Sequence, residues 1–214
     1  MRTITEQKPL PEILDSLKNH KKIYIAGCGT CATMCHTGGK AEVLAMKKAL
    51  EGAGKEVTGW MVIPTACDIL TKYAVIESAD RINTADAVLS MSCGLGVQTI
   101  AFFVKKPVYP ALNTLFMGWE ERPGHFIEMC AQCGDCVVGI TTGICPMTRC
   151  AKSILSGSCG GAKNGKCEQQ PEHDCAWVLI YDRLKELGML EKLKEIPEPK
   201  NYAKMKIPRQ ADIV

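Results

Sequence analysis

The chain has 214 residues, of which 46% are hydrophobic and 23% charged, and its formal net charge is +3. These values are ordinary for a globular protein of one or two domains, and the small, scattered positive charge argues against a nucleic-acid-binding surface. Thirteen cysteines are the unusual feature of the composition. Dense thiols in such a chain usually bind iron–sulfur clusters or zinc.

A framework of disulfides is the alternative use of these cysteines. Their odd number would leave one thiol over, and the first ten residues carry Arg2, Glu6 and Lys8 without the apolar stretch of a secretory signal. A chain of this length can also bury a core without covalent cross-links. We therefore expect reduced thiols and a cytoplasmic protein.

Strands and helices are predicted to alternate along the first half of the chain, after an amphipathic helix at 9–20. The predicted strands cover 22–26, 56–63, 86–91 and 106–111, and the helices cover 38–52, about ten residues after Asp68, and the segment that follows Gly96 through Phe103. This order predicts an α/β fold, a Rossmann-like doubly wound parallel sheet of about four strands. We assign it to a domain of residues 1–115.

Residues 87–104 form a stretch of 18 residues without a charge, which is long enough for a short membrane span. Polar residues interrupt it at Ser90, Ser92 and Gln98, and a Cys-Gly-Leu-Gly break lies in its middle. A strand, a turn and a buried helix explain this pattern better. We therefore predict no membrane span.

The composition changes at Phe116. Gly, Pro and Cys dominate from there to Cys167, and apolar periodicity survives only around 147–155. We predict a second domain at 116–190, cysteine-rich and mostly irregular or helical, in which bound metal supplies the folding energy. It includes a helix at 175–187. Residues 191–214 are expected to form an extended, solvated tail, with an arm that wraps around a partner as the alternative.

Cysteines follow each of the first three predicted strands, at Cys28, Cys67 and Cys93. The loop after the first strand adds Cys31 and Cys35. Because the carboxyl ends of parallel strands meet at one edge of a sheet, these five thiols are expected to converge there and to supply the four ligands of a [4Fe–4S] cluster. The alternative is that Cys67 or Cys93 is a small buried apolar side chain.

Two glycine motifs in the same region imitate nucleotide-binding sequences. Residues 27–32 fit G-x-G-x-x-A after a strand, but the second strand ends at Ile63-Pro64 without the acidic residue of that motif. The Gly-Gly-Lys sequence at 38–40 is followed by alanine where a P-loop needs Ser or Thr. Neither motif is complete.

The second half of the chain carries eight cysteines. Cys130, Cys133 and Cys136, followed by Cys145 before a proline, have the form of a ferredoxin ligand string, which favours a second [4Fe–4S] cluster over zinc. The remaining four thiols suffice for a zinc ion or a third [4Fe–4S] cluster, and we leave both open: Cys150, Cys159, Cys167 and Cys175.

Histidines offer further candidate ligands or proton-transfer groups, although a histidine without such a role is commoner. The candidates are His36, His125 and His173. Nucleophile–base arrangements and carboxylate pairs are not evident in the sequence, so we predict no catalytic residue.

Several motifs together resemble a known family. They are Gly27–Gly39, Cys93–Gln98, Cys130–Cys150, Ser158–Gly161, Asn164–Glu168 and Asp174–Trp177. Their sequences are similar to those of the small iron–sulfur subunit of two-component methylenetetrahydrofolate reductases, found in anaerobes that use the Wood–Ljungdahl pathway, which carries a "methylenetetrahydrofolate reductase C-terminal" domain. The resemblance covers roughly residues 20–190.

The resemblance implies a role in electron transfer. In that family a separate TIM-barrel subunit carries the flavin and reduces methylenetetrahydrofolate, and this chain is too short for such a barrel. The resemblance therefore implies an accessory, non-catalytic subunit of an oxidoreductase. It would receive electrons from ferredoxin or another donor, and pass them to the flavin of its partner.

Overall fold

The computed structural model describes residues 3–211. The chain forms two compact units that divide between Phe126 and Ile127, and each is described here by itself. This division lies further along the chain than the domain boundary predicted at 115/116, which stays a prediction.

The first unit contains a four-stranded parallel sheet, as predicted. Its strands are β2 (Lys22–Cys28), β3 (Glu56–Ile63), β4 (Ala87–Met91) and β5 (Val108–Pro110). They lie in the order β3-β2-β4-β5, with every neighbouring pair parallel. The chain goes from β2 outward to β3 and then returns past β2 to β4. The direction of winding therefore reverses between β2 and β4, where doubly wound sheets place their ligands.

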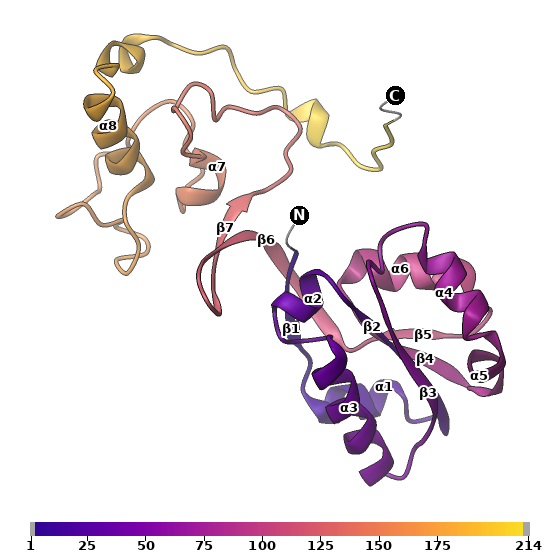
Figure 1. The fold of residues 1–214 in the computed structure, drawn as a ribbon. Helices are drawn as coiled ribbons and strands as arrows, with labels where there is room; N and C mark the ends of the chain where they lie inside the picture. Colours follow the sequence, from indigo (N-terminus) through magenta and orange to yellow (C-terminus); the bar gives the residue numbers. More distant parts are fainter. Residues whose placement is uncertain (1–2, 212–214) are drawn as a thin grey trace. The chain divides into compact units, whose positions relative to one another are not determined.

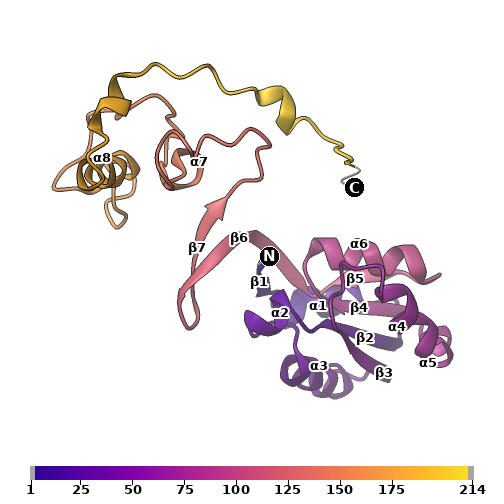
Figure 2. The same cartoon turned by 45° about the horizontal axis from the view of Figure 1, so that its top comes forward.

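Helices cover both faces of this sheet. Figure 1 and Figure 2 show α3 (Lys40–Gly52) on one face and α4 (Thr71–Glu77), α5 (Ala79–Thr84) and α6 (Gly94–Phe103) on the other. The predicted helix after Asp68 is thus two short helices. In α3 the buried side chains are Val43, Met46 and Leu50, spaced as one face of an amphipathic helix.

The core of the first unit is a single apolar cluster along the sheet. Strand β4 is buried at all five positions, as expected of a central parallel strand covered on both faces. The short helix α1 (Leu10–Ser16) adds Ile13, and Leu17 follows it; both side chains are fully buried. The uncharged stretch 87–104 is β4, a turn and α6, as predicted. Within residues 3–211, no helix has the length and apolar character needed to cross a membrane.

A second, three-stranded sheet is a feature that the sequence did not predict. It consists of β1 (Thr3–Gln7), β6 (Leu112–Arg122) and β7 (His125–Cys130) in the order β1-β6-β7. β1 pairs antiparallel with β6, and Thr3, Ile4 and Thr5 are buried. The assignment of irregular structure from Phe116 onward was wrong for β6 and β7, because most of their side chains are at least partly exposed and give no alternating apolar signal.

The second unit is mostly irregular. Its regular elements are α7 (Pro146–Arg149), α8 (Ala176–Glu186) and two 3₁₀ helices, η1 (Leu190–Lys194) and η2 (Tyr202–Met205). The predicted helix at 175–187 is α8, with Cys175 as its N-cap. The buried core of this unit consists of Trp177, Ile180 and Leu184 on one face of α8.

Candidate metal centres

Four of the five cysteines in the first unit line a single pocket at the carboxyl edge of the parallel sheet. The pocket has a volume of about 180 Å³. Its cysteines are Cys28, Cys31, Cys67 and Cys93, and its other walls include Thr30, Thr65, Ala66, Leu95 and Gly96. Each of the first three parallel strands therefore delivers a thiol to the pocket, as their order along the chain predicted.

The elements fix these cysteines in different ways. Cys28 is the last residue of β2, and its N–H donates to the Gly38 carbonyl at 3.0 Å. Cys31 begins the short helix α2 (Cys31–Met34), and Cys93 is the N-cap of α6. The positive end of the α6 dipole favours negative charge near Cys93, as a thiolate ligand requires.

Glycines allow the loops around the pocket to pack closely. A Cβ on Gly96 would lie 2.5 Å from the Ser92 hydroxyl oxygen and 2.9 Å from the Ala66 methyl carbon. A Cβ on Gly29 would lie 3.0 Å from the Pro64 carbonyl oxygen, and the Gly29 N–H donates to the Ile63 carbonyl at 2.8 Å. These contacts join the loops after β2, β3 and β4, so the pocket depends on missing side chains as well as on cysteines.

The thiols around the pocket affect one another electrostatically. Partial desolvation by the surrounding protein raises the pKa of Cys67, and the neighbouring Cys93 and Cys28 sulfurs raise it further. The Cys28 sulfur also lies 3.3 Å from the Thr30 hydroxyl. A raised pKa keeps Cys67 in the neutral thiol form in the absence of metal, so ligation of a metal by Cys67 would release its proton.

Cys35 is the member of the predicted set that does not line the pocket. Its sulfur lies 3.9 Å from the carbonyl oxygen of Thr3, a residue that does line it. The sequence offered five thiols for four positions, and the geometry of the first unit favours Cys35 as the spare one.

The donors of the pocket fit a [4Fe–4S] cluster. Such a cluster takes four thiolates around a polyatomic core, and four thiols surround a cavity with room for more than a single ion. Among residues 3–211, no group of three or more Cys, His, Asp or Glu side chains is arranged so that it could hold a metal ion. Within residues 3–211, the cysteines form no disulfides with one another.

The ferredoxin-like string of the second unit forms a tight loop. Gln132 and Gly134 have positive φ angles of 52° and 78°, which turn the chain between successive cysteines. The Gln132 N–H lies 3.3 Å from the Cys130 sulfur, and the Cys133 sulfur lies 3.8 Å from the Asp135 carbonyl oxygen. Backbone N–H groups directed at sulfur are typical of cluster-binding loops.

The side chain of Lys200 acts on this loop from the C-terminal part of the unit. Burial raises the pKa of the Cys133 thiol, but the hydrogen bond and positive charge of Lys200, together with backbone hydrogen bonds at Asp135 and Cys133, lower it below its usual value. Hydrogen bonds from Lys204 and from the Asn201 N–H likewise hold the pKa of Asp135 below its usual range. Thiolate is the metal-binding form of cysteine, so Lys200 favours ligation by Cys133.

The other cysteines of the second unit lie at several places in it. Cys145 borders a cavity of about 420 Å³ beside α7 and α8. Cys150 and Cys175 both pack against the Trp177–Leu184 core. The Cys167 N–H donates to the His173 carbonyl and the Cys175 N–H to the Gly165 carbonyl. Cys159 is exposed, with its sulfur 3.7 Å from Glu168. The ligand roles of these cysteines stay predictions.

The three candidate histidines have other neighbours. His125 lies 3.5 Å from the Glu121 carboxylate, and His173 lies 3.5 Å from that of Glu172. His36 has a positive φ of 53° at the end of the α2 turn. These positions do not add a donor to the pocket of the first unit.

Residues 109–203 match the family model described as "Methylene-tetrahydrofolate reductase C terminal". The match covers a little less than half of the chain and includes all eight cysteines of its second half, but not the pocket cysteines of the first unit. Neither the curated proteins nor the solved structures contain a match to the chain. Through residues 109–203, the chain is related to methylenetetrahydrofolate reductases.

Proposed function

We propose that this chain is an iron–sulfur electron-transfer subunit. It docks to a flavin-containing methylenetetrahydrofolate reductase subunit and relays electrons to its flavin in one-carbon metabolism, from ferredoxin or another donor. One [4Fe–4S] cluster is held by Cys28, Cys31, Cys67 and Cys93, and a second by the Cys130–Cys145 string. Cys150, Cys159, Cys167 and Cys175 hold zinc or a third cluster.

The observation that carries this proposal is the gathering of four thiols from three strand ends around one pocket. Four soft donors with room between them suit a cluster, and a [4Fe–4S] cluster supplies one-electron transfer when it is bound. The relation of residues 109–203 to methylenetetrahydrofolate reductases supports the choice of partner.

The residues around the pocket have distinct tasks in this role. Cys28 and Cys93 are buried, so the protein excludes water from that side of the site. Cys67 is exposed and lies on the open side. A cluster that is partly exposed in this way can exchange electrons with a protein docked at the opening, while its buried side is held rigidly by the sheet.

Exposed apolar side chains beside Cys67 offer a docking surface for the flavin subunit. Ile69, Leu70 and Tyr73 are 65%, 55% and 62% exposed, and Leu95 at the pocket wall is 46% exposed. Clustered apolar side chains on a soluble surface usually mark an interaction site. Their position next to Cys67 would bring a partner close to the pocket.

Anaerobic purification followed by iron, acid-labile sulfide and zinc analysis tests the cofactor assignment. We expect about eight iron atoms and eight sulfides per chain for two clusters, with zinc or additional iron at the remaining cysteines. A colourless chain that contains zinc without iron would instead identify a zinc-thiolate scaffold of the same complex, without a redox role.

Variants of the apolar surface test the docking assignment. Replacing Leu70 and Tyr73 by glutamate should weaken binding to the flavin subunit at least tenfold, because the charges would have to be desolvated in the interface. Phe102→Glu is the matched control, since Phe102 is 85% exposed at the other end of α6, about 12 Å from the helix start at 1.5 Å per residue. Equal loss of binding in both variants would contradict docking beside Cys67.

A further inference from the structure

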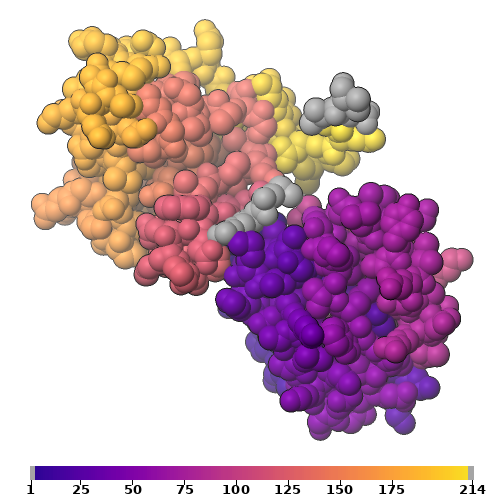
Figure 3. Space-filling view, viewed as in Figure 1, coloured from indigo at the N-terminus to yellow at the C-terminus, as the bar shows by residue number. Residues whose placement is uncertain are grey.

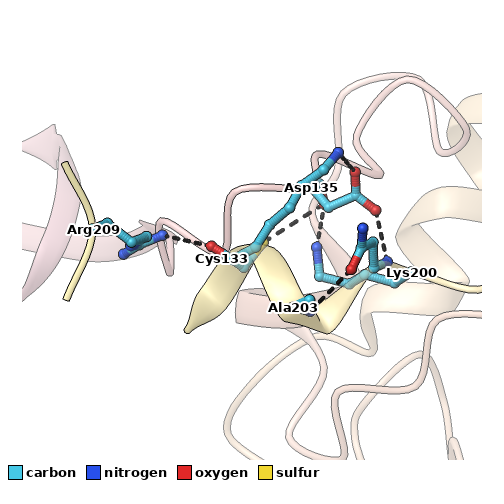
Figure 4. Close-up of polar contacts among 7 residues, drawn as sticks. Cys133, Asp135, Lys200, Ala203 and Arg209 are labelled. Carbon is cyan, nitrogen blue, oxygen red and sulfur yellow. Dashed lines mark hydrogen bonds and ion pairs between the residues drawn. The ribbon is translucent and has the colours of Figure 1, made fainter. Parts of the chain in front are cut away.

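The C-terminal segment 200–209 lies on the ferredoxin-like loop of its own unit. Figure 4 shows the contacts from this segment, which we call the arm, to residues 132–135. In the space-filling view of Figure 3 the arm is yellow and lies against salmon-coloured atoms of the same unit. The expected solvated tail is therefore anchored in this part, and its anchor is the chain's own cysteine loop.

Asp135 is the centre of the contact. Its carboxylate accepts hydrogen bonds from the Asn201 N–H at 2.8 Å and from the Lys204 ammonium at 2.5 Å. The Lys200 ammonium donates to the carbonyl oxygen of the same residue. One residue between Cys133 and Cys136 thus receives three donors from the arm.

Two further contacts extend along the loop. The Arg209 guanidinium donates to the Gln132 carbonyl at 2.7 Å and to the Lys204 carbonyl at 3.4 Å, so it connects the loop with the arm. A Cβ on Gly134 would lie 2.9 Å from the Lys204 carbonyl oxygen. The arm therefore contacts Gln132 and Asp135 through hydrogen bonds and Gly134 through close packing, and Lys200 also interacts with the Cys133 thiol.

The contact is also unbalanced in charge. Lys204 donates to the Asp135 carboxylate, whereas Lys200 and Arg209 donate to the backbone carbonyls of Asp135 and Gln132, so three positive charges meet one carboxylate in these contacts. Lys200 is 9% exposed, an unusual degree of burial for lysine. Burying an ammonium without a full counter-charge is unfavourable, unless further negative charge is bound nearby. A thiolate-ligated cluster at Cys130, Cys133 and Cys136 would supply that charge.

We propose that the arm is a built-in cationic clamp, which holds the Gln132–Asp135 loop in its ligand-binding conformation and raises the reduction potential of the cluster bound there. This proposal rests on the proposed cluster at the Cys130–Cys145 string. Reduction adds a negative charge to a cluster, and nearby positive charge stabilises the reduced form. Lys200, Lys204 and Arg209 act as positioning residues, because they hold the loop and do not ligate metal.

The test compares the full chain with the variant Lys200→Met/Lys204→Met, purified anaerobically. We expect the variant to keep its iron at first but to release it to a chelator at least tenfold faster, to show faster amide exchange at 131–136, and to have one of its cluster potentials shifted downward. Unchanged iron release, exchange and potentials in the variant would overturn the clamp. A wild-type chain without iron would instead overturn the proposed function. Failure of the clamp and failure of the proposed function therefore give different results.

Gly134→Ala tests the clamp without changing charge. It introduces a methyl group against the Lys204 backbone at a φ of 78°, so it should loosen the arm and speed iron release. Gly124→Ala is the matched control, because Gly124 has a φ of 77° with open space around its Cβ position. Equal effects of the two substitutions would show that backbone strain alone acts, and would overturn the role of the arm.

Discussion

The two units of the chain use their residues in opposite ways. The first unit buries a continuous cluster of apolar side chains along its parallel sheet, whereas the buried cluster of the second unit consists of Trp177, Ile180 and Leu184. The interactions within the second unit are instead those of its turns, exposed ion pairs such as Lys166–Asp174, and the contacts of the arm with the cysteine loop. Exposed ion pairs contribute little stability. The comparison indicates that the first unit is stabilised by its core, and it leads us to expect that the second depends on bound metal.

Removal of metal tests this difference between the two units most strongly, and it has the largest expected effect on their stability. If the second unit lacks a sufficient core, a chelator under reducing conditions should unfold it, while the first unit stays folded. Amide exchange after chelation should therefore rise to that of an unfolded chain over residues 131–209, and stay slow in β2 and β4. Slow exchange persisting around α7 and α8 would contradict a metal-dependent fold.

Single cysteine substitutions sharpen the account of the first unit. Cys67→Ser removes one donor of the pocket, and should lower the iron content by about four atoms per chain. Cys35→Ser is the matched control, because its sulfur lies outside the pocket, and it should leave the iron content unchanged. Iron analysis and the visible absorption of anaerobically purified protein measure both, and iron loss from Cys35→Ser alone would reverse the assignment.

Core substitutions test whether the units unfold separately. Leu89→Ala on β4 removes a fully buried side chain, and should lower the free energy of unfolding of the first unit by about 2–5 kcal/mol. Ile180→Ala, equally buried on α8, should affect the second unit. Calorimetry should show each substitution lowering a different transition. If either one lowers both transitions together, the two units unfold as one.

The smallest expected effect on stability concerns Asp86, which contacts the start of β2. Asp86 accepts hydrogen bonds from the N–H groups of Lys22 and Lys21 at 2.7 Å and 2.8 Å, which lower the pKa of its carboxyl. A lowered pKa in the folded state stabilises the protein above the ordinary aspartate value of about 3.9, and this contribution is lost as the pH falls through the lowered value. Asp86→Asn should therefore lower the melting temperature at pH 7 but not at pH 2. An equal difference at both pH values would contradict a charge effect.

The sequence predicted the first unit better than the second because its signals are local. Apolar runs with helices between them predicted the four parallel strands and their direction. Cysteine after each strand predicted which thiols would meet, since strand order places those ends at one edge. The absence of Cys35 from the pocket lining was beyond such reasoning, because cysteine spacing does not fix where the sulfur at the end of the short helix α2 lies.

Long-range pairing accounts for what the sequence did not predict. β1 and β6 are separated by about a hundred residues, and the short sequence of β1 gives no indication of its partner. The arm is a similar case: its basic residues were visible, but not that Asp135 and Gln132 would receive them. Neither contact leaves a periodic pattern, so neither could be read from spacing.

Electron transfer to a partner flavin is the central claim, and it can be measured directly. The anaerobically reduced chain should be mixed with the oxidised flavin-containing methylenetetrahydrofolate reductase subunit, and the flavin absorbance followed. The account predicts stoichiometric bleaching of the flavin, which slows strongly when Cys67→Ser replaces the wild-type chain but not when Cys35→Ser does. A reduced, iron-loaded wild-type chain that binds this subunit and leaves its flavin oxidised would contradict the account.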